Sequence, residues 1–280
     1  MKNKLTVFAV SILCAAHAIA SASAQELSAR EIAERTKNRP GYIHDEVTAL
    51  AMDLINSSGQ TRSRRFLRYQ GKTGNGKDTL IKFLAPADIE NTGTLNIEVR
   101  DDDDTQYLYL PAARKLRRIS TANKDQSWVG SDFSFEDLEE LDLDKFDFGL
   151  DSPEVIEGHD CFKYWMKPKD EDDSIYGKQV HWVKKQGFLP IRADYYEKDG
   201  TLLKRIFYRD LRDTSKITYA WTIVVENVKD SHRTELRREW LLIDTGLPEH
   251  LLSTRQLEAP ISNYKHPGNL WQLLSRAPGP

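Results

Sequence analysis

The stretch that decides the fold lies at residues 130–138 and reads Gly-Ser-Asp-Phe-Ser-Phe-Glu-Asp-Leu. It follows a long run of strand-like alternation, and it contains no spacing typical of a catalytic triad, a metal site or a phosphate loop. Ser134, with Asp137 three residues later, is typical of a helix N-terminus, because serine caps the first turn and an acid favours the positive end of the helix dipole. We therefore expect a helix over Phe133–Leu143 that packs as a lid on a curved sheet, an arrangement that suits ligand binding better than catalysis.

Outward from this stretch, period-two alternation predicts about eleven strands separated by turn signals. They cover residues 45–54, 61–70, 78–84, 94–100, 105–110, 161–167, 179–185, 190–196, 202–210, 217–228 and 234–243. Gly200 in Lys198-Asp199-Gly200 favours a hairpin turn, because glycine accepts a positive φ. A second helix is expected at Ser28–Arg35, where Ser28 and Glu31 form a capping box. The predicted fold is mainly β: a single curved antiparallel sheet forming a half-open barrel, with helices as a lid over the concave face.

The N-terminus is typical of an exported protein. Lys2 and Lys4 precede an apolar segment over residues 5–20, and Ala22-Ser23-Ala24 gives the small-x-small pattern that signal peptidase recognises. We expect residues 1–24 to be a signal peptide cleaved before Gln25, and residues 25–280 to form a single domain with a tail-like end at 262–280. No later stretch approaches the roughly 20 apolar residues that a membrane span requires. The predicted location is the periplasm.

Charge and cysteine content narrow the classes of protein. Removing Lys2 and Lys4 from the 40 basic residues leaves 38 against 43 acidic ones, a net charge of −5. This balance argues against nucleic acid as a partner, since binding to a phosphate backbone needs a clustered positive field. Cys161 is then the only cysteine, so the exported chain has no internal disulfide and depends on a hydrophobic core. We expect Cys161 to be a small buried apolar residue.

Several groups of polar residues could carry chemistry, but each has a simpler interpretation. The acids Asp101–Asp104 lack the alternating ligands and the glycine of a calcium loop, and they fit a solvated turn better. His44, Asp45 and Glu46 resemble part of a metal or acid–base site, although no second histidine follows at helical spacing. No serine lies in a Gly-x-Ser-x-Gly elbow. We therefore predict no catalytic residue, no metal site and no cofactor.

Aromatic residues fall on many of the predicted strands, and they are the better indication of function. A broad sheet with one apolar face must cover that face, and two helices cover only a part of it. An ordinary sandwich core would account for the same residues. The other interpretation is an apolar pocket of the kind that holds lipid or acyl chains.

Five segments of this chain, in this order, resemble the LolA-like outer-membrane lipoprotein-sorting protein family. They are Phe83–Asp88, Gly93-Thr94, Tyr107–Ala112, Arg117–Ile119 and Gly130–Leu138, and Leu251–Leu257 is similar to the closing strand of that family. The resemblance implies an incomplete antiparallel barrel with helices as a lid over a hydrophobic cavity. It also implies a shuttle that works beside a transporter of the resistance–nodulation–division type. The family offers no invariant catalytic or ligand residue to carry over.

The residues predicted to line this cavity come from alternate positions of strands that flank the expected lid. They are Ile97, Val99, Tyr107, Tyr109, Trp182, Tyr195 and Trp221. Ile97 and Val99 share a face of one strand, as Tyr107 and Tyr109 do on its expected hairpin partner. An error of one residue in register would send every residue of a strand to the other face.

The sequence therefore predicts a periplasmic carrier, without catalysis, of a lipoprotein, a lipid or another hydrophobic cargo for delivery to or from the outer membrane or a transporter partner. Two alternatives remain open at this point. One is an envelope-stress sensor of the same fold that binds a membrane-bound anti-sigma partner. The other is an enzyme acting on envelope lipid or glycan through His44, Asp45 and Glu46.

Overall fold

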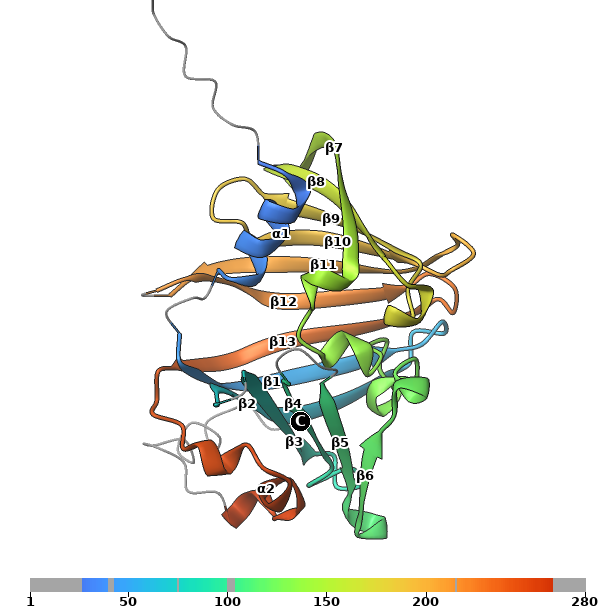
Figure 1. The fold of residues 1–280 in the computed structure, drawn as a ribbon. Coiled ribbons are helices and arrows are strands. Elements are labelled where there is room, and N and C mark those ends of the chain that lie inside the picture. The colour runs from blue at the N-terminus through green and yellow to red at the C-terminus, as the bar shows by residue number, and fades with distance from the viewer. Residues whose placement is uncertain (1–26, 40–42, 75, 100–103, 215, 264–280) are drawn as a thin grey trace, which may run out of the picture.

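A single antiparallel sheet of 13 strands dominates the computed structural model, which describes residues 27–39, 43–74, 76–99, 104–214 and 216–263 (Figure 1). The strand order is β6-β5-β4-β3-β2-β1-β13-β12-β11-β10-β9-β8-β7, so β6 and β7 are the two edges and the sheet stays open. The strands are β1 Asp45–Ile55, β2 Thr61–Lys72, β3 Lys77–Ala85, β4 Gly93–Ile97, β5 Thr105–Leu110, β6 Lys115–Ile119, β7 Phe146–Ile156, β8 His159–Pro168, β9 Lys178–Lys184, β10 Pro190–Tyr196, β11 Leu202–Asp213, β12 Thr218–Asn227 and β13 His232–Ile243.

The predicted fold class is confirmed, and each of the eleven predicted strands has its counterpart in the sheet. The sequence analysis missed β6 and β7. The hairpin between β4 and β5 is present, with Leu95 opposite Tyr107 and Ile97 opposite Thr105. The hairpin turn before β11 has Gly200 at φ 86°, as expected for a turn that requires positive φ.

The N-terminal helix is confirmed as α1, Ala29–Lys37. Ser28 Oγ accepts a hydrogen bond from the Glu31 N–H at 3.2 Å, and Glu31 Oε2 accepts one from the Ser28 N–H at 2.8 Å, which completes the capping box. Ile32 is fully buried and packs, with Leu27 beside it, against β8 residues such as Tyr164 and the start of β7. The apolar side of α1 therefore covers the last strands of the sheet.

Residues 120–145 connect β6 to β7, the two opposite edges of the sheet, and we call them the crossing segment. The predicted helix over Phe133–Leu143 is wrong: only Glu136–Leu138 and Leu143–Lys145 are helical here, each as a single 3-10 turn. The expected cap does form, since Ser134 Oγ accepts from the Asp137 N–H at 3.3 Å and the Asp137 carboxylate accepts from the Ser134 N–H at 2.7 Å. The turn stops at Glu139, whose ψ of 155° is extended. Six acids against one lysine over residues 136–145 disfavour a longer helix, because like charges repel across each turn.

The first half of the sheet is packed on both faces. Alternate residues of β1–β3 point to opposite sides, so Leu50, Phe66 and Phe83 meet Trp128 and Phe135 of the crossing segment. We call the side covered by the crossing segment the inner face. On the outer face a second cluster forms around residues contributed by the C-terminal part of the chain. Its buried members are Val47, Ala49, Leu67, Tyr69, Leu80, Leu95, Leu252, Leu257 and Ile261, and we call it the outer cluster.

The predicted closing strand at Leu251–Leu257 is also wrong, because this stretch holds a 3-10 turn followed by the helix α2, Thr254–Glu258. Ser253 caps α2 by accepting from the Gln256 N–H at 3.4 Å, and Leu257 is fully buried against the sheet.

Cys161 is fully buried, as expected. The signal-peptide prediction lies outside the described residues, as does nearly all of the tail predicted at 262–280. Among the described helices, none is long and apolar enough to cross a membrane.

Candidate functional site

Three neighbouring cavities line the inner face of the sheet, and the crossing segment runs between them. The first, of about 180 Å³, lies over β2–β5, the second, of about 400 Å³, lies over the ends of β1, β2, β12 and β13, and the third, of about 350 Å³, lies over β8–β11. Glu140 of the crossing segment borders all three, and Tyr208 and Pro190 border both the second and the third. The volumes of the two larger cavities fall within the range of ligand pockets.

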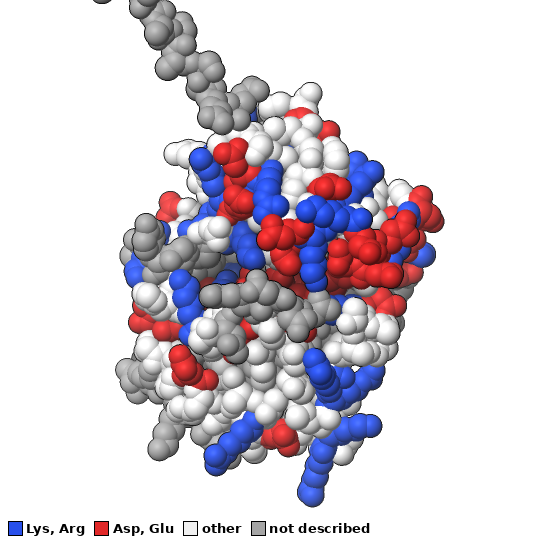
Figure 2. Space-filling view, in the orientation of Figure 1, with Lys and Arg blue, Asp and Glu red and all other residues white. Residues whose placement is uncertain are grey.

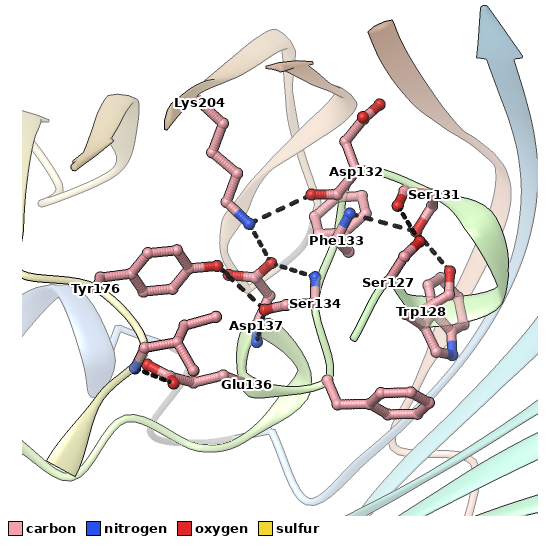
Figure 3. A network of polar contacts seen from close by, with 12 residues as sticks. Ser127, Trp128, Ser131, Asp132, Phe133, Ser134, Glu136, Asp137, Tyr176 and Lys204 are labelled. Carbon is pink, nitrogen blue, oxygen red and sulfur yellow. Dashed lines mark hydrogen bonds and ion pairs between the residues drawn. The ribbon is translucent and has the colours of Figure 1, made fainter. Parts of the chain in front are cut away.

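A buried polar network holds the crossing segment on the sheet (Figure 3). Lys204 of β11 forms an ion pair with Asp137, and both side chains are about 5% exposed. Tyr176 donates to the other oxygen of Asp137 at 2.8 Å, and its hydroxyl lies 3.0 Å from Ser134 Oγ. Burial and the Asp137 charge raise the pKa of Tyr176 well above its usual value, so it stays a neutral donor. Ser134 and Asp137 of the crossing segment are thus bound to β11 through Lys204 and to the segment before β9 through Tyr176.

Two further anchors flank this network, and Figure 3 shows the one at Glu136. Glu136 accepts from Ser174 Oγ at 2.5 Å and from the Ile175 N–H at 2.8 Å. At the other end Asp132 accepts from Thr234 Oγ1 at 2.7 Å and lies 2.8 Å from His232 Nδ1, both residues of β13. Asp132, Glu136 and Asp137 therefore attach the crossing segment to the rest of the protein, because their carboxylates are all bound by residues of other elements.

The floor of the third cavity is aromatic and neutral. Tyr164, Tyr195 and Tyr208 line it together with His181, which stacks on Tyr164 with ring centroids 5.0 Å apart. Burial raises the pKa of Tyr208 to about 12 and lowers the pKa of His181 to about 4, so both are uncharged at neutral pH. No hydrogen bond joins the three tyrosine hydroxyls to any other described residue. The floor offers polar groups without charge.

The rim of the third cavity is acidic. Seven acidic residues border it against three lysines, and most of these acids belong to the crossing segment. Glu139 Oε1 lies 3.0 Å from Lys124 Nζ, yet burial raises the pKa of Glu139 to about 7. Figure 2 shows acidic and basic side chains gathered side by side across the middle of this face.

The second cavity has the opposite balance, with six lysines and arginines on its walls against four acids. Arg68 of β2 forms an ion pair with Glu46, whose side chain is 8% exposed. Tyr219 donates to the other oxygen of Glu46 at 3.0 Å. Arg238 of β13 lies in the same wall, and its Nε donates to the Ala220 carbonyl at 3.2 Å. Apolar surface from Ile223, Leu189, Pro190 and Ile43 completes this cavity.

His44, Asp45 and Glu46 border the second cavity but do not form a joint acid–base site. The Asp45 carboxylate accepts from Thr245 Oγ1 and from the N–H groups of residues 245–247 at 2.6–3.2 Å. Glu46 is occupied by Arg68 and Tyr219, and the His44 side chain is exposed. No hydrogen bond joins any two of the three side chains among the described residues. This geometry removes the support for the enzyme interpretation.

The seven predicted cavity residues occupy different places. Tyr195 lines the third cavity, whereas Tyr107 borders the first cavity but also packs against the outer cluster. Ile97 and Tyr109 pack against the outer cluster, and Val99 lies beyond the end of β4.

The two predicted tryptophans border none of the three cavities. Trp182 alternates with the cavity residue His181 along β9 and thus lies on the outer face, where its Nε1 donates to Glu154 at 2.8 Å. Trp221 is half-buried beneath the Arg212 guanidinium, which lies 4.7 Å from the ring centroid.

Sequence reasoning missed the charged wall of the second cavity, because it considered only the aromatic and apolar residues of the strands as cavity lining. The sequence does contain an indication of this wall. Arg68 lies two residues after Phe66 on β2, so both side chains point to the same face, and a strand that buries Phe66 on the inner face also turns Arg68 inward.

Comparisons with known proteins agree with this architecture. A family model described as "Uncharacterized protein" matches residues 75–259. A solved structure from Vibrio parahaemolyticus is described as a domain of an outer membrane lipoprotein-sorting protein. Its sequence is 30% identical to this chain, and the match has a TM-score of 0.78 and covers 82% of this chain and 98% of that one. A DUF1329 family protein from Desulfovibrio piger ATCC 29098 is 31% identical at a TM-score of 0.78, over 82% and 97% of the two chains.

A LolA superfamily protein from Nitrosomonas europaea shares the fold, with a TM-score of 0.66 at 17% identity, over 82% of this chain and 100% of that one. No curated protein matches the chain. The resemblance to lipoprotein-sorting proteins that the sequence suggested is therefore confirmed at the level of structure.

Proposed function

Because this chain belongs to the DUF1329 family, we propose that it is a periplasmic carrier that holds a lipid, a lipoprotein acyl group or a similar hydrophobic cargo. The observation that supports this most is the row of cavities along the inner face, bordered by α1 and by the crossing segment. A similar chain is described as a lipoprotein-sorting domain, which fits a role in delivery to or from the outer membrane.

In this proposal the chain is exported, loses residues 1–24 before Gln25 and acts as a single domain. It receives or delivers its cargo beside an inner-membrane transporter, for which the resistance–nodulation–division type is our candidate. The walls described above add a constraint on the cargo. Because charged and aromatic groups line the cavities together, an amphiphile with a polar head fits them better than a bare hydrocarbon chain.

The test is to produce the full chain with its own leader, purify it from the cell envelope without detergent and extract it with organic solvent. Mass spectrometry of the extract should detect acyl-containing molecules in near-stoichiometric amount with the protein. The matched control is the same purification from cells that lack the chain. An extract without acyl species above that control, from protein that also takes up none from added vesicles, would contradict the carrier function.

A further inference from the structure

The second cavity contains more buried positive charge than its acids neutralise. Arg68 and Arg238 lie in one wall, and the carboxylate of Glu46 is the acid nearest to both. The ion pair joins Glu46 to Arg68, and no ion pair engages Arg238 among the described residues. One buried carboxylate therefore faces two guanidinium groups.

Arg238 shows the cost of this arrangement. Its Nη1 atom is buried and has no hydrogen-bond partner among the described residues. Burial lowers the pKa of Arg238 and the nearby Arg68 charge lowers it further, although the Glu46 charge raises it, and the guanidinium lies 5.2 Å from the centroid of the Tyr219 ring. A buried donor without a partner and a buried charge that shares its only nearby counter-ion with a second cation both cost free energy. A ligand that supplied an anion at this point would recover that energy on binding.

The surroundings indicate what kind of anion fits. Ile223, Leu189 and Pro190 border the same cavity, and Tyr208 joins it to the aromatic floor of the third cavity. An anionic group on Arg238 would thus have apolar surface directly beside it. A planar guanidinium with free donors suits a carboxylate or a phosphate.

We propose that Arg68 and Arg238 form an acceptor site for the anionic head group, carboxylate or phosphate, of an amphiphilic cargo whose apolar part lies along the inner face. This inference rests on the carrier function proposed above and specifies its substrate class. The acidic rim of the third cavity repels the same head group, so the charge pattern also fixes which end of the cargo lies in which cavity.

The experiment compares binding of palmitate, methyl palmitate and palmitoyl lysophosphatidic acid to the delipidated full chain by isothermal titration calorimetry. The wild-type protein should bind at least one of the two acids about ten-fold or more tightly than the ester, the effect expected of a charge-assisted hydrogen bond. Preference for palmitate over the lysophospholipid, or the reverse, identifies a carboxylate or a phosphate head group.

Arg238→Gln should lower the affinity for the preferred acid to that for the ester, and Arg238→Lys should retain part of the preference. The matched control is Arg237→Gln, because Arg237 is the next residue of β13 and pairs with Asp53 and Glu235 on the other face. That change should leave the preference intact. Arg238→Gln should also fold about as stably as the wild type, since Glu46 keeps its ion pair with Arg68 and one buried positive charge is removed.

Three results would overturn the inference. Equal affinity of the wild-type protein for acids and ester would contradict it while leaving the carrier function in place, as would an undiminished preference for acid in folded Arg238→Gln protein. Failure of the folded wild-type protein to bind any of the three probes would instead reject both proposals together. If Arg238→Gln protein does not fold, the comparison of acid with ester in the wild type and in Arg238→Lys decides.

Discussion

At the scale of single residues, Lys82 of β3 is a cation with no exposed surface and no ion pair among the described residues. Its Nζ donates to the carbonyls of Asn91 at 2.6 Å and Leu257 at 2.7 Å, and it thereby ties the end of α2 to the sheet. Burial lowers the pKa of Lys82 to about 8 from its usual 10.5. The proton of Lys82 therefore makes the stability of the protein depend on pH between about 8 and 10.5.

The direction of this effect follows from the proton count. Between pH 8 and 10.5 the unfolded chain binds a proton at Lys82 that the folded protein has released, so this group makes the protein more stable as pH rises. Above pH 8, we expect the unfolding free energy of the wild type to rise relative to that of Lys82→Met, by up to about 1.4 kcal/mol per pH unit. Urea unfolding at pH 7.5, 8.5 and 9.5 measures it. The exposed Lys115→Met is the control, and parallel curves for wild type and Lys82→Met would contradict the account.

Single residues also show which part of the candidate site could not be predicted from the sequence. The prediction that Trp182 faces inward rests on the assumption that aromatic residues of the strands point into the cavity, which the sequence cannot verify for β9. Each aromatic residue is equally acceptable on either face of a sheet whose two sides are both packed, and hydrophobicity then carries no information about direction. The charged residue Arg68, in contrast, would have been informative, because burial of an arginine requires a partner.

At the scale of elements, the two missed strands are the two edges of the sheet. β6 consists of Lys-Leu-Arg-Arg-Ile, and β7 contains Gly149 and Pro153. Lysine, arginine and proline are the residues by which natural sheets protect their edges, and they weaken the period-two pattern that reveals inner strands. The inner strands were predicted because burial on one or both faces imposes that pattern on them.

The crossing segment shows a second limit of local sequence signals. The cap at Ser134 and Asp137 was identified correctly, but the length of the helix was not. Repulsion among the acids of residues 136–145 disfavours a longer helix, and Lys204 and Tyr176 hold the carboxylate of Asp137 from other elements. Contacts between residues so distant in the chain are not encoded in the pattern of the segment itself.

The attachment of the crossing segment gives a prediction at this scale. Lys204→Met leaves the carboxylate of Asp137 buried without its cation, and we expect a loss of about 3–5 kcal/mol in the free energy of unfolding. Adding Asp137→Asn should recover part of that loss, because the uncompensated charge is gone. Urea unfolding measures all three proteins.

The control for this prediction is Arg212→Gln, which breaks the exposed ion pair with Asp210 at 2.6 Å and should leave the unfolding midpoint unchanged. If Lys204→Met behaves like Arg212→Gln, the crossing segment is not held by the buried network.

At the scale of the whole molecule, the topology itself builds the site. The chain leaves the sheet at one edge and re-enters it at the opposite edge, so residues 120–145 must pass over one face. That passage creates an inner face with cavities on both sides of the segment and leaves the other face to the outer cluster. The overall class of fold could be predicted from strand spacing and from the family resemblance. The division of the cavity could not, since it depends on the register of 13 strands.

The central claim is that cargo lies on the inner face, and the most direct measurement is binding of an environment-sensitive fluorescent fatty acid to matched variants. Ile223→Glu places a charge in the second cavity, and Leu150→Glu places the same charge on an exposed apolar residue of β7. With native circular dichroism in both, the account predicts that Ile223→Glu loses at least about ten-fold in affinity and that Leu150→Glu binds like the wild type. Unchanged binding by folded Ile223→Glu protein would contradict the claim.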